Sequence, residues 1–150
     1  MIIDNLELTG ALQISLNNEV VHQCDNLVVT AGKEWVAGRF KNTLGGFTIP
    51  GEMTHMALGS GSAAAAAANT TLGTELASSR IALTNAGGTV SNATVQYDAT
   101  WTSSHGVYAI EEAGIFSAAS GGTMLARTVF AIINKGTDDT VTISWTITVS

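Results

Sequence analysis

The sequence is poor in cysteine and in charge, and each shortage excludes a class of protein. The single cysteine, Cys24, cannot form a disulfide within the chain. Only 12% of the 150 residues are charged, against about 25% in an average soluble domain. Hydrophobic residues make up 45%, which is unlike a disordered chain. A surface with so little charge must be covered by small polar residues or by neighbouring subunits, and the second option predicts a homo-oligomer, a dimer or a trimer.

Basic residues are few and scattered. Six Lys and Arg stand against twelve Asp and Glu, which gives a net charge of −6. Proteins that neutralise phosphates need clustered Lys and Arg, so nucleic-acid binding is disfavoured. Only residues 33–41 offer a small basic face, and an ordinary solvated helical turn is the stronger interpretation of it.

Long apolar runs and a signal sequence are also missing. No run approaches the roughly 20 apolar residues of a membrane span. The first residues, MIIDNLELTG, have neither a basic n-region nor an apolar h-region. We therefore expect a soluble protein without a membrane segment, made and used without secretion through a signal peptide.

Short segments of alternating apolar and polar residues are abundant. Leu6–Leu16 and Thr89–Trp101 alternate with period two, and Val107–Phe116, Met124–Ile133 and Val141–Val149 supply the last three strands. About seven to nine strands at about ten-residue spacing favour an antiparallel all-β fold. The predicted fold is mostly β, either a β-sandwich of jelly-roll-like type or a small barrel.

One short helix is expected over Ala31–Phe40, with Thr30 as its N-cap. Val36 and Phe40 lie four residues apart on one face of that helix, which is predicted to close one end of the β core. The length of the chain predicts a single domain spanning residues 1–150.

Two segments are predicted to be flexible, or to become ordered on contact with a partner. One is the N-terminal segment, Met1–Leu16. The other is the low-complexity loop Gly59–Asn69, GSGSAAAAAAN, in which six alanines are too few for a stable isolated helix.

Metal binding and the common catalytic motifs find little support. His22 and Cys24 lie on one face of a strand, but zinc needs two further ligands and nothing places His55 or His105 nearby. The sequence GSGS at residues 59–62 has neither the Lys-Ser/Thr end of a phosphate loop nor the G-x-S-x-G pattern of a nucleophile elbow. We expect no cofactor, no metal and no enzymatic activity.

Three charges stand out within the apolar stretch from residue 111 to residue 134: Glu111, Glu112 and Arg127. Neighbouring residues of a strand point to opposite faces, so one glutamate is expected to point inward and to need Arg127 or backbone N–H groups as partners. A structural lock between adjacent strands is therefore favoured over acid–base catalysis. This lock predicts that Arg127→Ala destabilises the fold.

The order of several segments resembles a family of small bacteriophage virion proteins. These segments are NLVVTAGKEWVAGRF, MTHMALGSG with its Ala-rich loop, TTLGTELASSRIALT, and EAGIFSAASGGTMLARTVFAIINKG with the ending SWTITVS. The likeness begins at Asn26 and extends to the C-terminus. Members, many from short-tailed and cyanobacterial phages, are described as tail-fibre, tail-collar or structural proteins, and their shared pattern names no catalytic residue.

The resemblance implies a component of the virion, assembled in the cytoplasm of the host bacterium. A capsid decoration (cement) protein that binds the major capsid protein on the outside of the head is the first hypothesis. A short-tail adaptor, or a tail-fibre component that binds tail proteins or recognises the host, is the alternative. The sequence shows neither the repeats nor the long coiled coil of a fibre shaft, which favours the cement hypothesis.

Overall fold

The computed structural model describes residues 5–40 and 50–150, and within them the chain forms nine strands and one helix. The elements, in chain order, are β1 (Leu8–Leu16), β2 (Glu19–Val28), α1 (Thr30–Arg39), β3 (His55–Gly59), β4 (Ile81–Ala82), β5 (Thr89–Ser91), β6 (Thr94–Trp101), β7 (Tyr108–Phe116), β8 (Met124–Lys135) and β9 (Val141–Val149).

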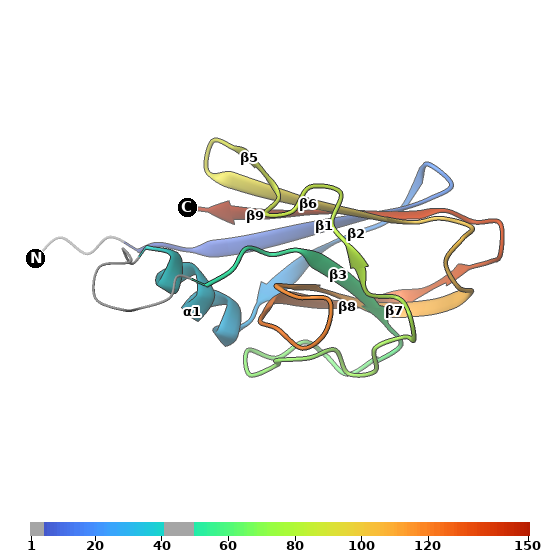
Figure 1. The fold of residues 1–150 in the computed structure, drawn as a ribbon, viewed down its shortest axis with the longest axis horizontal. Coiled ribbons are helices and arrows are strands. Elements are labelled where there is room, and N and C mark those ends of the chain that lie inside the picture. The colour runs from blue at the N-terminus through green and yellow to red at the C-terminus, as the bar shows by residue number, and fades with distance from the viewer. Residues whose placement is uncertain (1–4, 41–49) are drawn as a thin grey trace, which may run out of the picture.

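The strands form one curled antiparallel sheet in the order β4-β3-β7-β8-β2-β1-β9-β6-β5. The sheet folds over into two layers, so that it makes a half-barrel (Figure 1). One layer contains β5, β6, β9 and β1, and the other contains β8, β7, β3 and β4. Strand β2 joins them, because it pairs along β1 but reaches β8 only through Leu27 and Val28. The predicted mostly β fold with one short helix is confirmed.

The core lies between the two layers, and the alternating strands face it as their sequences predicted. In β9 every second residue is buried, from Val141 to Ile147, while the intervening Thr and Ser side chains point outward. Strand β6 buries Tyr97, Ala99 and Trp101 in the same way. Trp101 and Trp145 are fully buried and are the largest side chains of this core.

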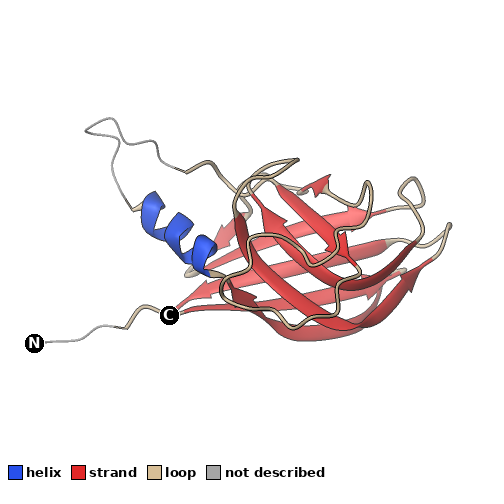
Figure 2. Cartoon of the chain, turned by 90° about the horizontal axis from the view of Figure 1, so that it is seen from below, coloured by secondary structure: helices blue, strands red, loops and turns tan. Residues whose placement is uncertain are grey.

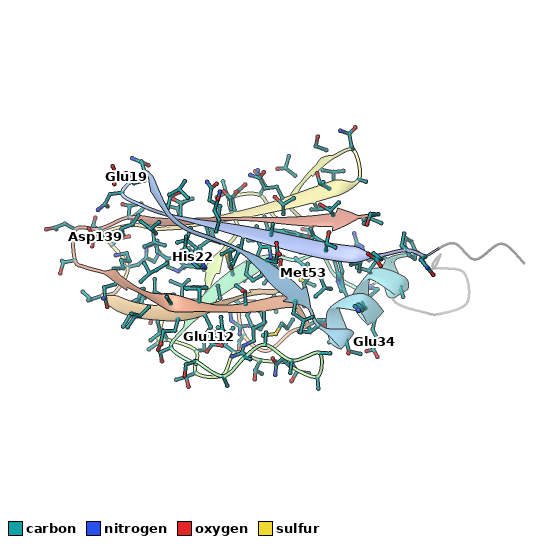
Figure 3. The ribbon with its side chains drawn as sticks, turned by 180° about the vertical axis from the view of Figure 1, so that it is seen from behind. Glu19, His22, Glu34, Met53, Glu112 and Asp139 are labelled. Atoms are coloured by element: carbon teal, nitrogen blue, oxygen red, sulfur yellow. The ribbon has the colours of Figure 1, made fainter. Side chains whose placement is uncertain are left out.

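Two hairpins meet at one end of the half-barrel, where Figure 3 shows Glu19 and Asp139. Asn17 and Asn18 form the turn between β1 and β2 with φ of 50° and 69°, a left-handed conformation that asparagine tolerates better than most residues. The Asn17 side chain donates to Asp139 (2.8 Å) and accepts from the backbone N–H of Thr140 (2.9 Å). These bonds fasten the β1–β2 turn to the β8–β9 turn.

Helix α1 lies at the opposite end, beside the start of β1 (Figure 2). The predicted N-cap was wrong: the helix begins at Thr30, its N-cap is Val29, and no side chain caps it. The predicted apolar face was also wrong in part, because Phe40 is 74% exposed. Val36 and Trp35 do pack against the core. Trp35 and Arg39 also donate to the carbonyl oxygens of Gly51 (2.6 Å) and Pro50 (2.7 Å).

The N-terminal segment differs from the prediction that it is flexible or ordered by a partner. Residues 1–4 lie outside the described residues, but Leu8–Leu16 is an interior strand that pairs with β2 on one side and β9 on the other. Leu12 and Ile14 are buried in the core. The chain's own sheet therefore orders this strand.

Candidate functional site

A buried ion pair joins β7 and β8 on the face of their layer that points away from the main core. Arg127 donates from Nε to Glu112 Oε2 (2.8 Å), and its Nη2 lies 2.7 Å from the same oxygen. The two side chains are 2% and 0% exposed, respectively. Arg127 is paired with Gly114 in the sheet, so Glu112 is its diagonal neighbour on the same face.

Glu111 is not part of this pair, which corrects the predicted trio. The β7–β8 register is irregular between Ile110 and Glu112. Ile110 consequently packs into the core between the layers, whereas Glu112 points the other way. Glu111 lies at the irregularity, partly exposed, and has no hydrogen bond or ion pair from its side chain within the part of the chain that the structure describes.

The Glu112 carboxylate is fully occupied by donors. Besides Arg127, it accepts from the backbone N–H groups of Gly61 (2.9 Å), Gly73 (2.9 Å) and Thr74 (2.8 Å). Burial raises the pKa of Glu112, but the three backbone donors and the guanidinium stabilise the carboxylate more, and its pKa lies below the ordinary value. Glu112 is therefore a buried carboxylate held in its ionised form.

The Arg127 guanidinium holds the Ala-rich loop. It donates to the carbonyl oxygen of Ala63 (3.0 Å) and to Asn69 Oδ1 (2.9 Å). The same Asn69 oxygen accepts from the backbone N–H of Ala66 (2.7 Å). The loop over residues 59–69, predicted to be flexible or ordered by a partner, is instead ordered by an ion pair of the chain itself.

Two glycines make room for the carboxylate. A Cβ atom at Gly59 or at Gly61 would collide with the Glu112 carboxyl group. The glycines of the GSG sequence therefore mark a close approach between the loop backbone and a side chain. This was the one signal in the sequence that the loop packs tightly.

A second arginine fastens the next part of the same loop and was missed by the sequence analysis. Arg80 pairs with Glu75 through two contacts of 2.9 and 2.6 Å, and its guanidinium stacks 3.7 Å from the centre of the Phe116 ring. It also donates to the carbonyl oxygen of Gly121 (2.9 Å). The signal available in the sequence was the spacing of Glu75 and Arg80, two opposite charges five residues apart in an otherwise uncharged segment.

The loop covers a small second core on the outer side of β3, β7 and β8. Its buried residues are Val29, Ala57, Leu72, Phe116 and Met124. This packing explains why Glu112–Phe116 of β7 are all buried, since both faces of that strand are covered. We refer to residues 60–74, together with the Glu112–Arg127 pair that holds them, as the alanine platform.

The Glu112 carboxylate in the alanine platform is not accessible to a substrate. The oxygens of Glu112 already accept four donors, and the carboxylate is closed to solvent. A general acid or base must reach its substrate within hydrogen-bonding distance, and Glu112 cannot do so in this arrangement. The exposed side chains of the platform are instead the alanine methyl groups at Ala63, Ala64 and residues 66–68, together with the hydroxyl groups of Ser62, Thr70, Thr71 and Thr74.

The histidines and the cysteine are not gathered into a site. Cys24 Sγ lies 3.5 Å from Thr128 Oγ1, and the His22 ring packs 5.5 Å from Phe130. His55 hydrogen-bonds Thr54, and His105 accepts from the backbone of Thr102. Among residues 5–40 and 50–150, no three His, Cys, Asp or Glu side chains are grouped so that they could hold a metal ion.

A polar hollow lies on the outer face of the other layer. It has a volume of about 740 Å³ and crosses β2, β1, β9 and β6. Small residues form its floor, since Ala11 of β1 pairs with Thr146 of β9, and Ser144 pairs with Gln13. Gln23 of β2 and Gln96 of β6 stand on either side of this floor. The hollow presents amide and hydroxyl groups and the Asp25 carboxylate, and it is a second candidate binding surface.

Within the described residues, no helix is long and apolar enough to cross a membrane. No protein-family model, no curated protein and no solved structure matches this chain.

Proposed function

We propose that this chain is a non-enzymatic structural protein of a bacteriophage virion, a capsid decoration (cement) protein that binds the major capsid protein on the outside of the head. The observation that carries the proposal is the alanine platform. A buried ion pair holds an exposed loop that has no charge between Gly61 and Gly73. The likeness of the segment order to small phage virion proteins supports the same class.

The rigidity of the platform favours protein binding. Burying two charges costs several kcal/mol per ion before pairing, so both ions need their hydrogen-bond partners. The loop backbone supplies some of these partners, and its conformation is thereby fixed. A loop that is already ordered loses little conformational entropy when a partner covers it. Alanine methyl groups can be covered by a flat protein surface without desolvating any charge.

A cement protein stabilises a shell by mass action. It binds the assembled shell and not the loose capsid subunits, so its binding energy shifts the equilibrium toward the assembled state. In this proposal the platform contacts the capsid, and the copies of the decoration protein associate with one another as dimers or trimers.

The test has two parts. Quantitative mass spectrometry of purified virions should find this protein in many copies, one set for each symmetry-related site of the head. About a dozen or fewer copies per particle would contradict the cement proposal, because that number suits a single vertex or the tail.

The second part tests the platform. Ala67→Glu and Ala68→Glu place a charge on exposed positions of the loop and should abolish binding of the purified protein to heads that lack it. Ala109→Glu places the same charge on an exposed position of β7 and is the matched control. All three variants should keep the thermal stability of the wild type, and equal binding by all three would exclude the platform as the contact.

The polar hollow favours one alternative, a short-tail adaptor or a tail-fibre component that recognises the host. Its amides and hydroxyls are groups that hydrogen-bond a sugar. Under this alternative, purified protein should adsorb to host cells and block infection, and Gln13→Ala combined with Gln23→Ala should remove both effects. Adsorption that is unchanged by these substitutions would exclude the hollow as the binding site.

A further inference from the structure

Helix α1 lies beside the segment that leads into β1 (Figure 1), and an apolar groove lies between them. It has a volume of about 400 Å³, and its apolar lining includes Leu6, Leu8, Val36 and Phe40. A second hollow of about 320 Å³ continues from it and shares Leu8 and Lys33. The two hollows together extend along the first residues of β1 to the end of β2.

The apolar side chains around these hollows are unusually open to solvent. Leu6 is 61% exposed, Phe40 is 74% exposed, and Leu27 at the second hollow is 36% exposed. They are three of the eight large hydrophobic side chains exposed in the described residues. Clustered apolar exposure of this kind marks an interaction surface.

The groove itself carries one charge of each sign, and Asp25 lines the second hollow. Glu7 and Lys33 both line it, and within the described residues neither side chain forms an ion pair with another group. The groove therefore combines protruding apolar side chains, a hollow that can receive them, and two opposite charges. These are the parts that a surface needs in order to pair with a copy of itself.

We propose that a second copy of this chain docks on the groove in a two-fold arrangement. In such an interface the same patch is used twice, so a contact from one residue to another is repeated in the opposite direction. Phe40 and Leu6 of each copy fill the hollow of the other, and Glu7 of each copy faces Lys33 of the other. This interface rests on the self-association expected in the proposed function and names the surface that performs it.

The test is sedimentation of the full chain over a range of concentrations. The wild type should form a dimer, and Leu6→Ser combined with Phe40→Ser should raise its dissociation constant by about a hundredfold. Both side chains are largely exposed in the single chain, so the double variant should unfold at the wild-type temperature. Val90→Ser, at a 69% exposed position on β5, is the matched control and should leave dimerisation unchanged.

Charge reversal tests the two-fold geometry itself. Glu7→Lys alone and Lys33→Glu alone should each weaken the dimer about tenfold, because each creates two like-charge contacts. The combination of both should restore wild-type dimerisation. A chain that is monomeric throughout, a trimer, or a double variant no tighter than the single variants would overturn the interface. A monomeric chain would contradict this interface but not the cement proposal, which is tested by the number of copies in the virion.

Discussion

Glu112 shows how one side chain can decide the structure of a distant loop. A carboxylate without exposure to water is costly unless its oxygens are paired, and here four donors satisfy them. Arg127 alone would leave acceptor positions empty. The three loop amides fill them, so the loop and the ion pair stabilise each other.

Replacing Glu112 by Gln should therefore destabilise the fold. Gln keeps the shape of the side chain but leaves Arg127 as a buried, uncompensated charge, and it turns an N–H group toward the loop donors. We expect the free energy of unfolding to fall by about 3 kcal/mol, measured by urea denaturation.

The neighbouring residue provides the matched control for this substitution. Glu111→Gln makes the same chemical change one position earlier, at a partly exposed side chain. Its effect should stay within about 0.5 kcal/mol, as for other surface substitutions. Equal effects of the two substitutions would contradict the assignment of Glu112 as the buried partner.

The lowered pKa of Glu112 predicts how stability depends on pH. Its pKa in the folded protein lies below the value in the unfolded chain, about 4.3. The stabilisation is thus fully present above that value and is lost as the pH falls through the folded pKa. Urea denaturation at a series of pH values should show the difference between wild type and Glu112→Gln shrinking below about pH 4.

The other carboxylates of the chain also titrate in acid, but they are common to both proteins. Taking the difference between wild type and variant removes their contribution. A difference that stays constant down to the lowest pH at which the variant still folds would show that Glu112 does not carry the charge assigned to it.

At the scale of elements, the sequence predicted strands better than loops. Strand β9 has one face in the core and one face in solvent, so its alternation from Val141 to Val149 showed its conformation directly. Strand β7 is different, because residues 112–116 are buried on both faces. Its apolar run predicted a strand but could not show that a loop covers the second face.

The loop over residues 59–69 could not be predicted because the groups that order it lie far away in the chain. Its partners Glu112 and Arg127 are between 51 and 64 residues from the loop atoms that they hold. Local composition shows only that six alanines and several small polar residues lack a fold of their own. The sequence predicted that the buried pair locks adjacent strands. It did not predict that the same pair holds the loop.

The side chain of Asn69 connects the loop to Arg127, because its Oδ1 accepts hydrogen bonds from both. Asn69→Ala removes the acceptor for the Ala66 N–H and for Arg127 Nη1. We expect the Ala66 amide to exchange with solvent deuterium faster, by at least about tenfold, while the Gly61 amide, held by Glu112, keeps its protection. Amide exchange followed by NMR measures both positions in one experiment.

Asn134→Ala is the control for this substitution, since Asn134 is exposed on β8 and lies away from the loop. It should leave both amides unchanged. Loss of protection at Gly61 as well as Ala66 in Asn69→Ala would mean that the loop opens as one unit, and that Glu112 does not hold its first half independently.

At the scale of the whole molecule, the two layers are joined along both sides. Strand β2 connects them on one side through its short pairing with β8. On the other side, the backbone N–H of Thr84, after β4, donates to the carbonyl oxygen of Asp98 in β6 (2.8 Å). The indole N–H of Trp101 also donates to the carbonyl oxygen of Ser79 (2.7 Å). One core cluster contains side chains from both layers.

This double connection predicts that the layers unfold together. Trp101 and Trp145 report on the layer of β6 and β9, whereas Glu112 stabilises the opposite layer. In a Trp35→Phe background, which removes the partly exposed tryptophan, Glu112→Gln should lower the urea midpoint of tryptophan fluorescence and that of far-UV circular dichroism by the same amount. A substitution that destabilises one layer would then lower the unfolding midpoint reported by Trp101 and Trp145 in the other layer by the same amount. The opposite result is an unchanged fluorescence midpoint with a circular dichroism transition that splits or moves to lower urea. The layers would then be separate folding units, and the prediction of a single domain from the length of the chain would be wrong.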